Sequence, residues 1–145
     1  MRLHSPRHPR HEEAATALHE LAADQSEHGR PVLVEGPRDV AALRALGLPG
    51  PFEVVNRGWD VGRRVAHLVE TYGTRGPDGG PAVHVLMDWD RTGGRLQSTF
   101  CRRLEAFDVK VNTSTRDVLM RCLKPETRTV EGMSGLVDVL TDEGR

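Results

Sequence analysis

The sequence contains no isoleucine, only two lysines and only two cysteines, and aromatic residues make up 4% of the chain. Cys101 and Cys122 are too few for a four-cysteine zinc module or a disulfide framework. No segment approaches the roughly 20 consecutive apolar residues of a membrane-spanning helix, and the first residues lack the apolar core of a signal peptide. We therefore expect a cytoplasmic protein without a membrane partner. The scarcity of aromatic residues also argues against a base-stacking platform for nucleic acid.

Arginine replaces lysine almost completely. Of the 20 basic residues, only Lys110 and Lys124 are lysine, and 21 acidic residues bring the net charge to −1. Two explanations are open: a GC-rich genome, whose codons favour arginine, or a surface that binds phosphates through bidentate guanidinium groups. With this charge balance, any nucleic-acid-binding surface must be local rather than spread over the whole molecule.

The 145 residues are enough for one domain with an ordinary hydrophobic core. Residues 1–30 are predicted to form a tail and a helix over 11–28, and residues 31–145 an α/β domain. A last short strand is predicted at 129–130 and a closing helix at 134–140. Within the domain, apolar runs alternate with amphipathic stretches, which predicts helices between strands at 32–35, 52–55, 82–87 and 108–112.

The predicted strands are continuously apolar, as in Val32-Leu33-Val34. Such strands are buried on both faces, which is typical of a parallel sheet covered by helices on each side. The predicted fold class is therefore α/β: a Rossmann-like three-layer fold with a mostly parallel central sheet of about four strands, preceded by an N-terminal helix.

Acidic residues stand where two of these strands end. Glu35 follows the first strand, and Asp88 and Asp90 follow the third. Parallel sheets bind ligands beyond the carboxyl ends of their strands, so the three carboxylates converge if these strands are neighbours. An extended backbone directs residues two apart to the same side, which leaves Trp89 for the packed interior.

Three converging carboxylates repel one another unless a cation neutralises them. Oxygen ligands suit Mg²⁺ better than Zn²⁺, so Glu35, Asp88 and Asp90 are predicted to bind one or two Mg²⁺ ions, with Mn²⁺ as a substitute. The alternative is that strand-end acids simply cap the helices that follow them.

Candidate phosphate-binding groups surround these acids. Gly93 and Gly94 are predicted to open a helix with uncovered backbone amides, which can approach a phosphate closely. Asp39 is interpreted as a helix N-terminal acid that favours the helix dipole. Arginines near the same strand ends are candidates to hold a phosphate, each with a solvated surface charge as the alternative: Arg38, Arg57, Arg91 and Arg95.

Two motifs together resemble the Toprim domain, the catalytic module shared by topoisomerases, bacterial-type primases and certain nucleases. The size and layout of the chain resemble most the archaeal small primase-like Toprim proteins, in which the domain stands almost alone. The matching residues are Val32-Leu33-Val34-Glu35-Gly36 with Asp39, and Leu86-Met87-Asp88-Trp89-Asp90 with Gly93.

The resemblance implies that Glu35, Asp88 and Asp90 bind Mg²⁺ and carry catalysis, with Glu35 also acting as general acid or base. It also implies that the first and third strands lie side by side. The expected function is a Mg²⁺-dependent protein that cleaves or transfers phosphodiester bonds of DNA or RNA, in a primase-like or nuclease-like way.

Two other functions stay open. The single tyrosine, Tyr72, lies on a predicted helix, and the chain lacks the cysteines of a primase zinc module. A module that holds Mg²⁺ and nucleic acid while a protein partner completes the chemistry is therefore one alternative. The other is a haloacid dehalogenase-type phosphatase, because Asp88 to Thr92 resembles the Asp-x-Asp-x-Thr of that family, although that family places the motif on its first strand.

Overall fold

The computed structural model describes residues 8–55 and 58–141. Four short strands form one sheet in the order β2-β1-β3-β4, and every pairing is parallel. The predicted parallel sheet is confirmed, including the adjacency of the first and third strands, where Val32 is opposite His84. The strands are β1 (Val32–Val34), β2 (Phe52–Val54), β3 (Val83–Val85) and β4 (Val111–Asn112).

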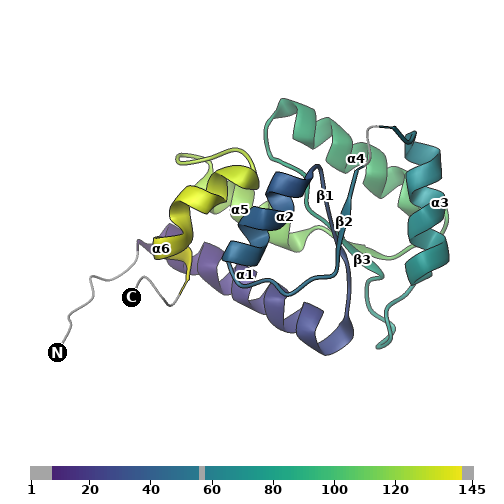
Figure 1. Cartoon of the computed structure of the whole chain (residues 1–145), viewed down its shortest axis with the longest axis horizontal. Coiled ribbons are helices and arrows are strands. Elements are labelled where there is room, and N and C mark those ends of the chain that lie inside the picture. The colour runs from purple at the N-terminus through teal and green to yellow at the C-terminus, as the bar shows by residue number, and fades with distance from the viewer. Residues whose placement is uncertain (1–7, 56–57, 142–145) are drawn as a thin grey trace.

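Helices precede, connect and follow these strands (Figure 1). The α-helices are α1 (Pro9–His28), α2 (Pro37–Ala45), α3 (Val61–Tyr72), α4 (Arg91–Glu105), α5 (Ser114–Leu123) and α6 (Val137–Leu140), and η1 (Glu131–Leu136) is a 3₁₀-helix.

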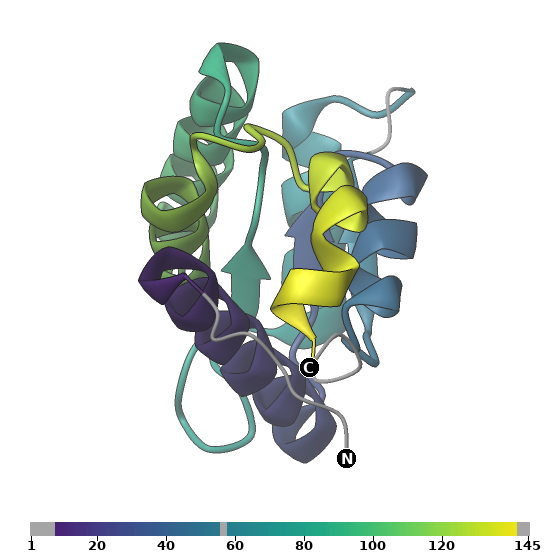
Figure 2. The same cartoon turned by 90° about the vertical axis from the view of Figure 1, so that its left-hand side faces the viewer.

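The helices cover both faces of the sheet, as a three-layer fold requires. On one face, α1, α2, α5, η1 and α6 pack over Val32 and Val34. On the other face, α3 and α4 pack over Leu33, Val83 and Val85. The alternation along β1 explains the two layers, because successive side chains of a strand point to opposite faces. Figure 2 looks onto the layer that contains α1 and α6.

The predicted N-terminal helix is part of this core. Ala14, Leu18 and Leu21 of α1 are at most 3% exposed and pack against α5 and the C-terminal helices. Among the described residues, no helix has both the length and the apolar character needed to cross a bilayer.

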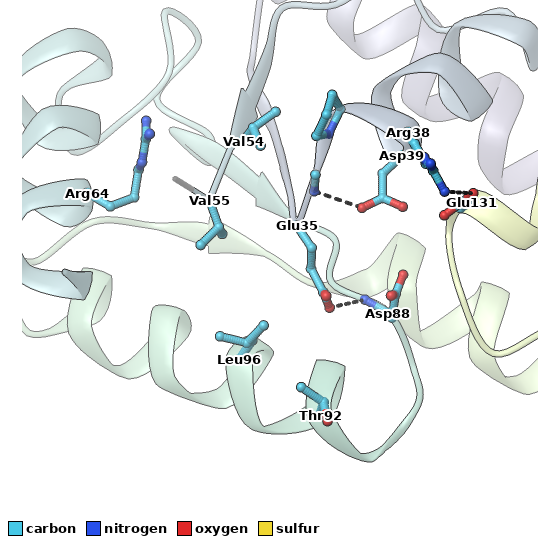
Figure 3. Close-up of a pocket in the computed structure, with 12 residues that line it drawn as sticks. Glu35, Arg38, Asp39, Val54, Val55, Arg64, Asp88, Thr92, Leu96 and Glu131 are labelled. Carbon is cyan, nitrogen blue, oxygen red and sulfur yellow. Dashed lines mark hydrogen bonds and ion pairs between the residues drawn. The ribbon is translucent and has the colours of Figure 1, made fainter. Parts of the chain in front are cut away.

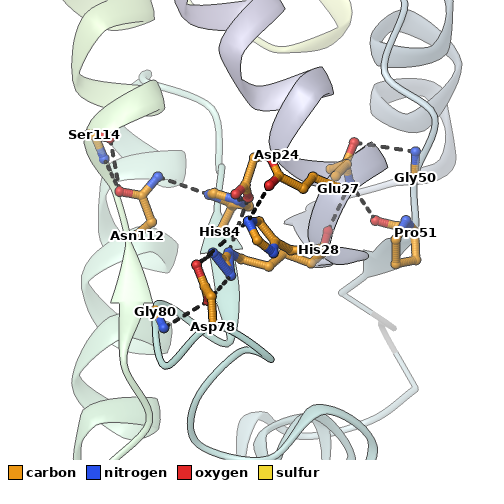
Figure 4. Close-up of polar contacts among 12 residues, drawn as sticks. Asp24, Glu27, His28, Gly50, Pro51, Asp78, Gly80, His84, Asn112 and Ser114 are labelled. Carbon is orange, nitrogen blue, oxygen red and sulfur yellow. Dashed lines mark hydrogen bonds and ion pairs between the residues drawn. The ribbon is translucent and has the colours of Figure 1, made fainter.

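A polar network joins α1 to the amino-terminal side of the sheet (Figure 4). His84 on β3 is 6% exposed, with its Nε2 2.7 Å from Asp24 Oδ2 and its Nδ1 2.9 Å from the Asn112 amide nitrogen. Arg30, just before β1, pairs with Asp24 at 3.1 Å and with Asp78 at 2.6 Å. These contacts satisfy polar groups that packing removes from water.

Two predicted elements are wrong in detail. Residues 129–130 do not form a strand; they lead into η1 through a turn in which Thr129 Oγ1 accepts a hydrogen bond from the Gly132 amide at 2.9 Å. In addition, α4 begins at Arg91, before the two glycines predicted to open it, because the Asp90 side chain caps the helix earlier.

Candidate functional site

An open cleft of about 920 Å³ lies at the carboxyl ends of β1 and β3. From β1 the chain turns through α2 to β2 on one side, and from β3 it turns through α4 to β4 on the other. Such a switch point is where parallel sheets bind ligands. The cleft is lined by Glu35, Gly36, Pro37, Arg38, Asp39, Val54, Val55, Arg64, Asp88, Thr92, Leu96 and Glu131 (Figure 3).

Glu35 and Asp88 come together in this cleft. Glu35 Oε1 accepts a hydrogen bond from the Asp88 backbone amide at 3.1 Å (Figure 3). The Asp88 carboxylate is held in turn, because its Oδ1 accepts a hydrogen bond from the Val130 amide at 2.7 Å. The second oxygen of each carboxylate has no hydrogen-bond partner within the described part of the chain, so these two acids retain ligand capacity.

Asp39 and Asp90 stand close to this pair but are bonded within their own helices. Asp39 Oδ2 accepts a hydrogen bond from the Gly36 amide at 3.0 Å and so stabilises the start of α2. Asp90 Oδ1 accepts one from the Gly93 amide at 2.7 Å and caps α4. Asp90 is not among the residues that line the cleft, and its predicted role as a ligand and catalytic residue stays a prediction. Trp89 is buried, as predicted.

The clustered acids shift one another's pKa. The pKa of Asp88 is raised to about 7, chiefly because burial penalises the charged form; Glu35, Asp39 and Asp90 add to the rise and the Val130 amide opposes it. Burial also raises the pKa of Glu35 and of Asp39. Burial and mutual repulsion thus both disfavour the charged forms of these carboxylates.

The donor set of this corner consists of carboxylate oxygens, which suit Mg²⁺, Ca²⁺ or Mn²⁺ and not Zn²⁺. Within residues 8–55 and 58–141, however, no three acidic, histidine or cysteine side chains are close enough to hold a cation by themselves. Mg²⁺ keeps several waters and commonly takes only one or two carboxylates together with substrate phosphate. Glu35 and Asp88 fit that smaller requirement.

The predicted phosphate-binding arginines lie in different places. Arg38 lines the cleft and is 84% exposed, with its guanidinium 3.7 Å from Glu131 Oε1. Arg91 and Arg95 are exposed, one turn apart on α4, and do not line the cleft. Arg57 lies outside the described residues.

The two glycines do not present uncovered amides, so that prediction is wrong. The Gly93 amide donates to Asp90 Oδ1, and the Gly94 amide donates to the Asp90 carbonyl at 2.9 Å. Gly93 has a different role: a Cβ there would collide with the Asp88 carbonyl. Glycine at this position lets α4 approach the end of β3.

Two arginines near the cleft were missed. Arg64 on α3 lines it, pairs with Glu53 at 3.3 Å and stacks on the Trp59 ring at 4.5 Å. Arg116 on α5 donates to the backbone carbonyls at the end of β3. Arg116 lies in the first turn of α5, shortly after β4, whereas Arg64 lies within α3, well beyond the end of β2. The rule that takes charged residues directly after a strand selects Arg57 after the second strand, so it could not reach Arg64, whose position depends on how α3 packs.

Comparisons with known proteins connect the chain to one set of relatives. A UPF0292 protein of Thermococcus onnurineus is 32% identical over 105 residues, which are 72% of this chain and 71% of that protein. A UPF0292 protein of Methanosarcina acetivorans is 29% identical over 128 residues, covering 85% of this chain and 81% of that protein. No family model matches the chain.

One solved structure shares the fold. It is a putative protein from Aquifex aeolicus, superimposed with a TM-score of 0.60 over 87% of this chain and 98% of that chain. Its 21% sequence identity supports a similar fold and nothing more.

The predicted membership of the Toprim family is wrong. The relatives carry the name UPF0292 instead of Toprim or primase, and no Toprim model matches. The physical reason is that acids after β1 and β3, each followed by a helix, are features of the switch point of a parallel sheet. Unrelated parallel α/β proteins share this geometry, so two short motifs do not specify one family.

Proposed function

This chain belongs to the UPF0292 protein family, and we propose that it is a Mg²⁺-dependent protein that cleaves or transfers phosphodiester bonds of nucleic acid in the cleft beside Glu35 and Asp88. Mn²⁺ is the expected substitute ion. The proposal places the protein in the cytoplasm, where nucleic acid and Mg²⁺ are both available.

The contact between Glu35 and Asp88 carries this proposal. It joins the ends of two neighbouring strands in an open cleft, with Asp39 beside them. No lysine, arginine or histidine of the described segments forms an ion pair with these three acids; the arginines that line the cleft pair instead with Glu131 and Glu53. A divalent cation would supply the missing positive charge.

Nucleic acid is the substrate class that fits the surroundings. The cleft volume is that of a ligand site and much larger than one phosphate. Arg38 lies on its wall, and Arg91 and Arg95 are exposed on the helix that begins beside it, with no ion-pair partner within the described residues. Guanidinium groups bind phosphate oxygens in bidentate fashion, so this arrangement supports contact with a phosphate backbone.

In this proposal Glu35 and Asp88 would hold the ion, and the Asp88 amide and the Val130 amide fix the orientation of their carboxylates. When bound, Mg²⁺ supplies charge neutralisation at the reacting phosphate and activation of water. Arg38, exposed on the wall of the cleft, would contact the phosphate backbone of the substrate.

The test is a panel of labelled DNA and RNA substrates incubated with and without Mg²⁺ or Mn²⁺. We expect turnover in the wild type that Glu35→Gln and Asp88→Asn abolish while the circular dichroism spectrum is unchanged. Asp138→Asn is the matched control, because it removes one exposed carboxylate from α6, outside the cleft. Wild-type turnover in Glu35→Gln or Asp88→Asn would contradict the proposal.

A binding module that needs a partner protein is the second candidate. The finding that favours it is that no three ligating side chains converge among the described residues, which leaves ligand positions for a partner to fill. Under this alternative the protein binds nucleic acid with an affinity that falls as salt rises, because phosphate contacts release counterions, yet it cleaves no member of the panel.

A further inference from the structure

Arg116 lies in the first turn of α5, directly after the edge strand β4. The residue is only 8% exposed. Its Nε donates to the Met87 carbonyl at 3.1 Å, and its Nη2 donates to the Asp88 carbonyl at 2.9 Å. One guanidinium group thus bridges two successive carbonyls where the chain leaves β3.

Arg116 differs from the other buried arginines in its charge partners. Arg30 pairs with Asp24 and Asp78, and Arg64 pairs with Glu53. Arg116 forms no ion pair with any carboxylate in the described parts of the chain. A buried charge without a direct partner is costly, so a fold that keeps one has a use for it.

The surroundings of Arg116 point to that use. The Asp88 residue is held by three groups: Glu35 accepts from its amide, Arg116 donates to its carbonyl, and Val130 donates to its carboxylate. Gly93 packs against the same carbonyl from α4. The Asp88 backbone is therefore fixed by β1, α4 and α5 together, and its orientation determines where the carboxylate points.

We propose that Arg116 is the positioning residue of the cation site: its hydrogen bonds to the Met87 and Asp88 carbonyls hold the backbone that carries the Asp88 carboxylate. This inference rests on the proposed function, because it assumes that Glu35 and Asp88 bind a divalent cation. Arg116 itself contacts neither the ion nor the substrate.

The test measures Mn²⁺ affinity by electron paramagnetic resonance in the wild type, Arg116→Met, Arg116→Lys and Arg30→Met. Loss of groups that orient metal ligands typically weakens affinity by roughly 10–100-fold, and we expect that loss in Arg116→Met. Arg116→Lys retains the charge but lacks the planar fork that reaches both carbonyls, so a measurable loss smaller than that of Arg116→Met is expected. Arg30→Met is the matched control: it also removes a buried, hydrogen-bonded arginine, but at the amino-terminal side of the sheet, and should bind Mn²⁺ as the wild type does.

The outcomes separate the inference from the function. Mn²⁺ binding by the wild type with unchanged affinity in Arg116→Met or Arg116→Lys overturns the role of Arg116 alone. An equal loss in Arg30→Met also overturns it, because any destabilising change would then have the same effect. If Arg116→Met does not fold, Arg116→Lys decides by the same criterion. No Mn²⁺ binding by the wild type removes the proposed function itself.

Discussion

Gly93 and Gly94 stand next to each other in the first turn of α4 but face different surroundings. A Cβ at Gly93 would collide with the Asp88 backbone, whereas a Cβ at Gly94 would meet only the Arg116 guanidinium at 3.9 Å, an ordinary contact. We expect Gly93→Ala to lower the free energy of unfolding by about 1–3 kcal/mol, as overpacking does. Gly94→Ala should be neutral or raise it by up to about 1 kcal/mol, since alanine favours the helix. Urea unfolding of both variants measures the difference, and equal values would contradict the close packing at Gly93.

Single residues of the site were predictable only where one rule applied directly. Glu35 and Asp88 follow strands that the apolar pattern identifies, and neighbouring parallel strands bring their carboxyl ends together. The sequence did not decide the role of Asp90, because an acid after a strand serves equally as a ligand or as a helix cap. The role of Gly93 depends on the approach of α4 to Asp88, which arises only in the packed structure.

At the scale of elements, His84 joins α1 to the sheet, and its protonation should weaken that contact. Asn112 accepts from Ser114 Oγ and therefore donates to His84 Nδ1, so Nε2 carries the hydrogen that Asp24 accepts. The network holds a neutral imidazole. Burial lowers the pKa of His84; the Asp24 carboxylate raises it and Arg30 lowers it further.

The sign of the pH effect follows from this lowered pKa. Below its ordinary value of about 6.5, the unfolded state takes up a proton that folded His84 resists. The contribution of His84 to the free energy of unfolding is therefore full above about pH 6.5. It falls as the pH drops below that value, by at most about 1.4 kcal/mol per pH unit. Asp88, whose pKa is raised, contributes the opposite slope. Because the two slopes overlap, the measurement is the difference in the free energy of unfolding between the wild type and His84→Gln, from urea unfolding at pH 7.5, 6.5 and 5.5. A constant difference over this range would contradict the prediction.

The elements themselves were largely predictable because their cause is local. Apolar runs and capping residues mark β1, β3 and the helices that follow them. The segment after α5 was not predictable in this way, since the β-branched side chains of Thr129 and Val130 favour a strand. In the structure their hydrogen bonds go to a turn and to Asp88 instead of a neighbouring strand. Such long-range competition overrides propensity.

For the whole molecule, the parallel sheet and its helical layers follow from continuous apolar strands and the rule that parallel strands need helical crossovers. The adjacency of the first and third strands was expected only from the family resemblance, and the places of β2 and β4 in the sheet were not predicted. The protein family could not be predicted from this architecture, because the same architecture serves many unrelated functions. The proposed cation site is also a property of the whole molecule, because its two carboxylates follow β1 and β3 and their orientation depends on α4, α5 and the segment before η1.

A cation that binds only the folded protein must stabilise all of it by mass action. For a dissociation constant of about 1 mM, about 10 mM Mg²⁺ should raise the free energy of unfolding by about 1.4 kcal/mol, measured as an increase in the thermal midpoint. Sodium chloride at matched ionic strength is the control for general screening. Glu35→Gln and Asp88→Asn should lose the Mg²⁺-dependent increment, whatever their stability without the ion. Asp138→Asn should keep it, because its carboxylate lies on α6. An equal increment in all four proteins would mean that Mg²⁺ binds outside the cleft.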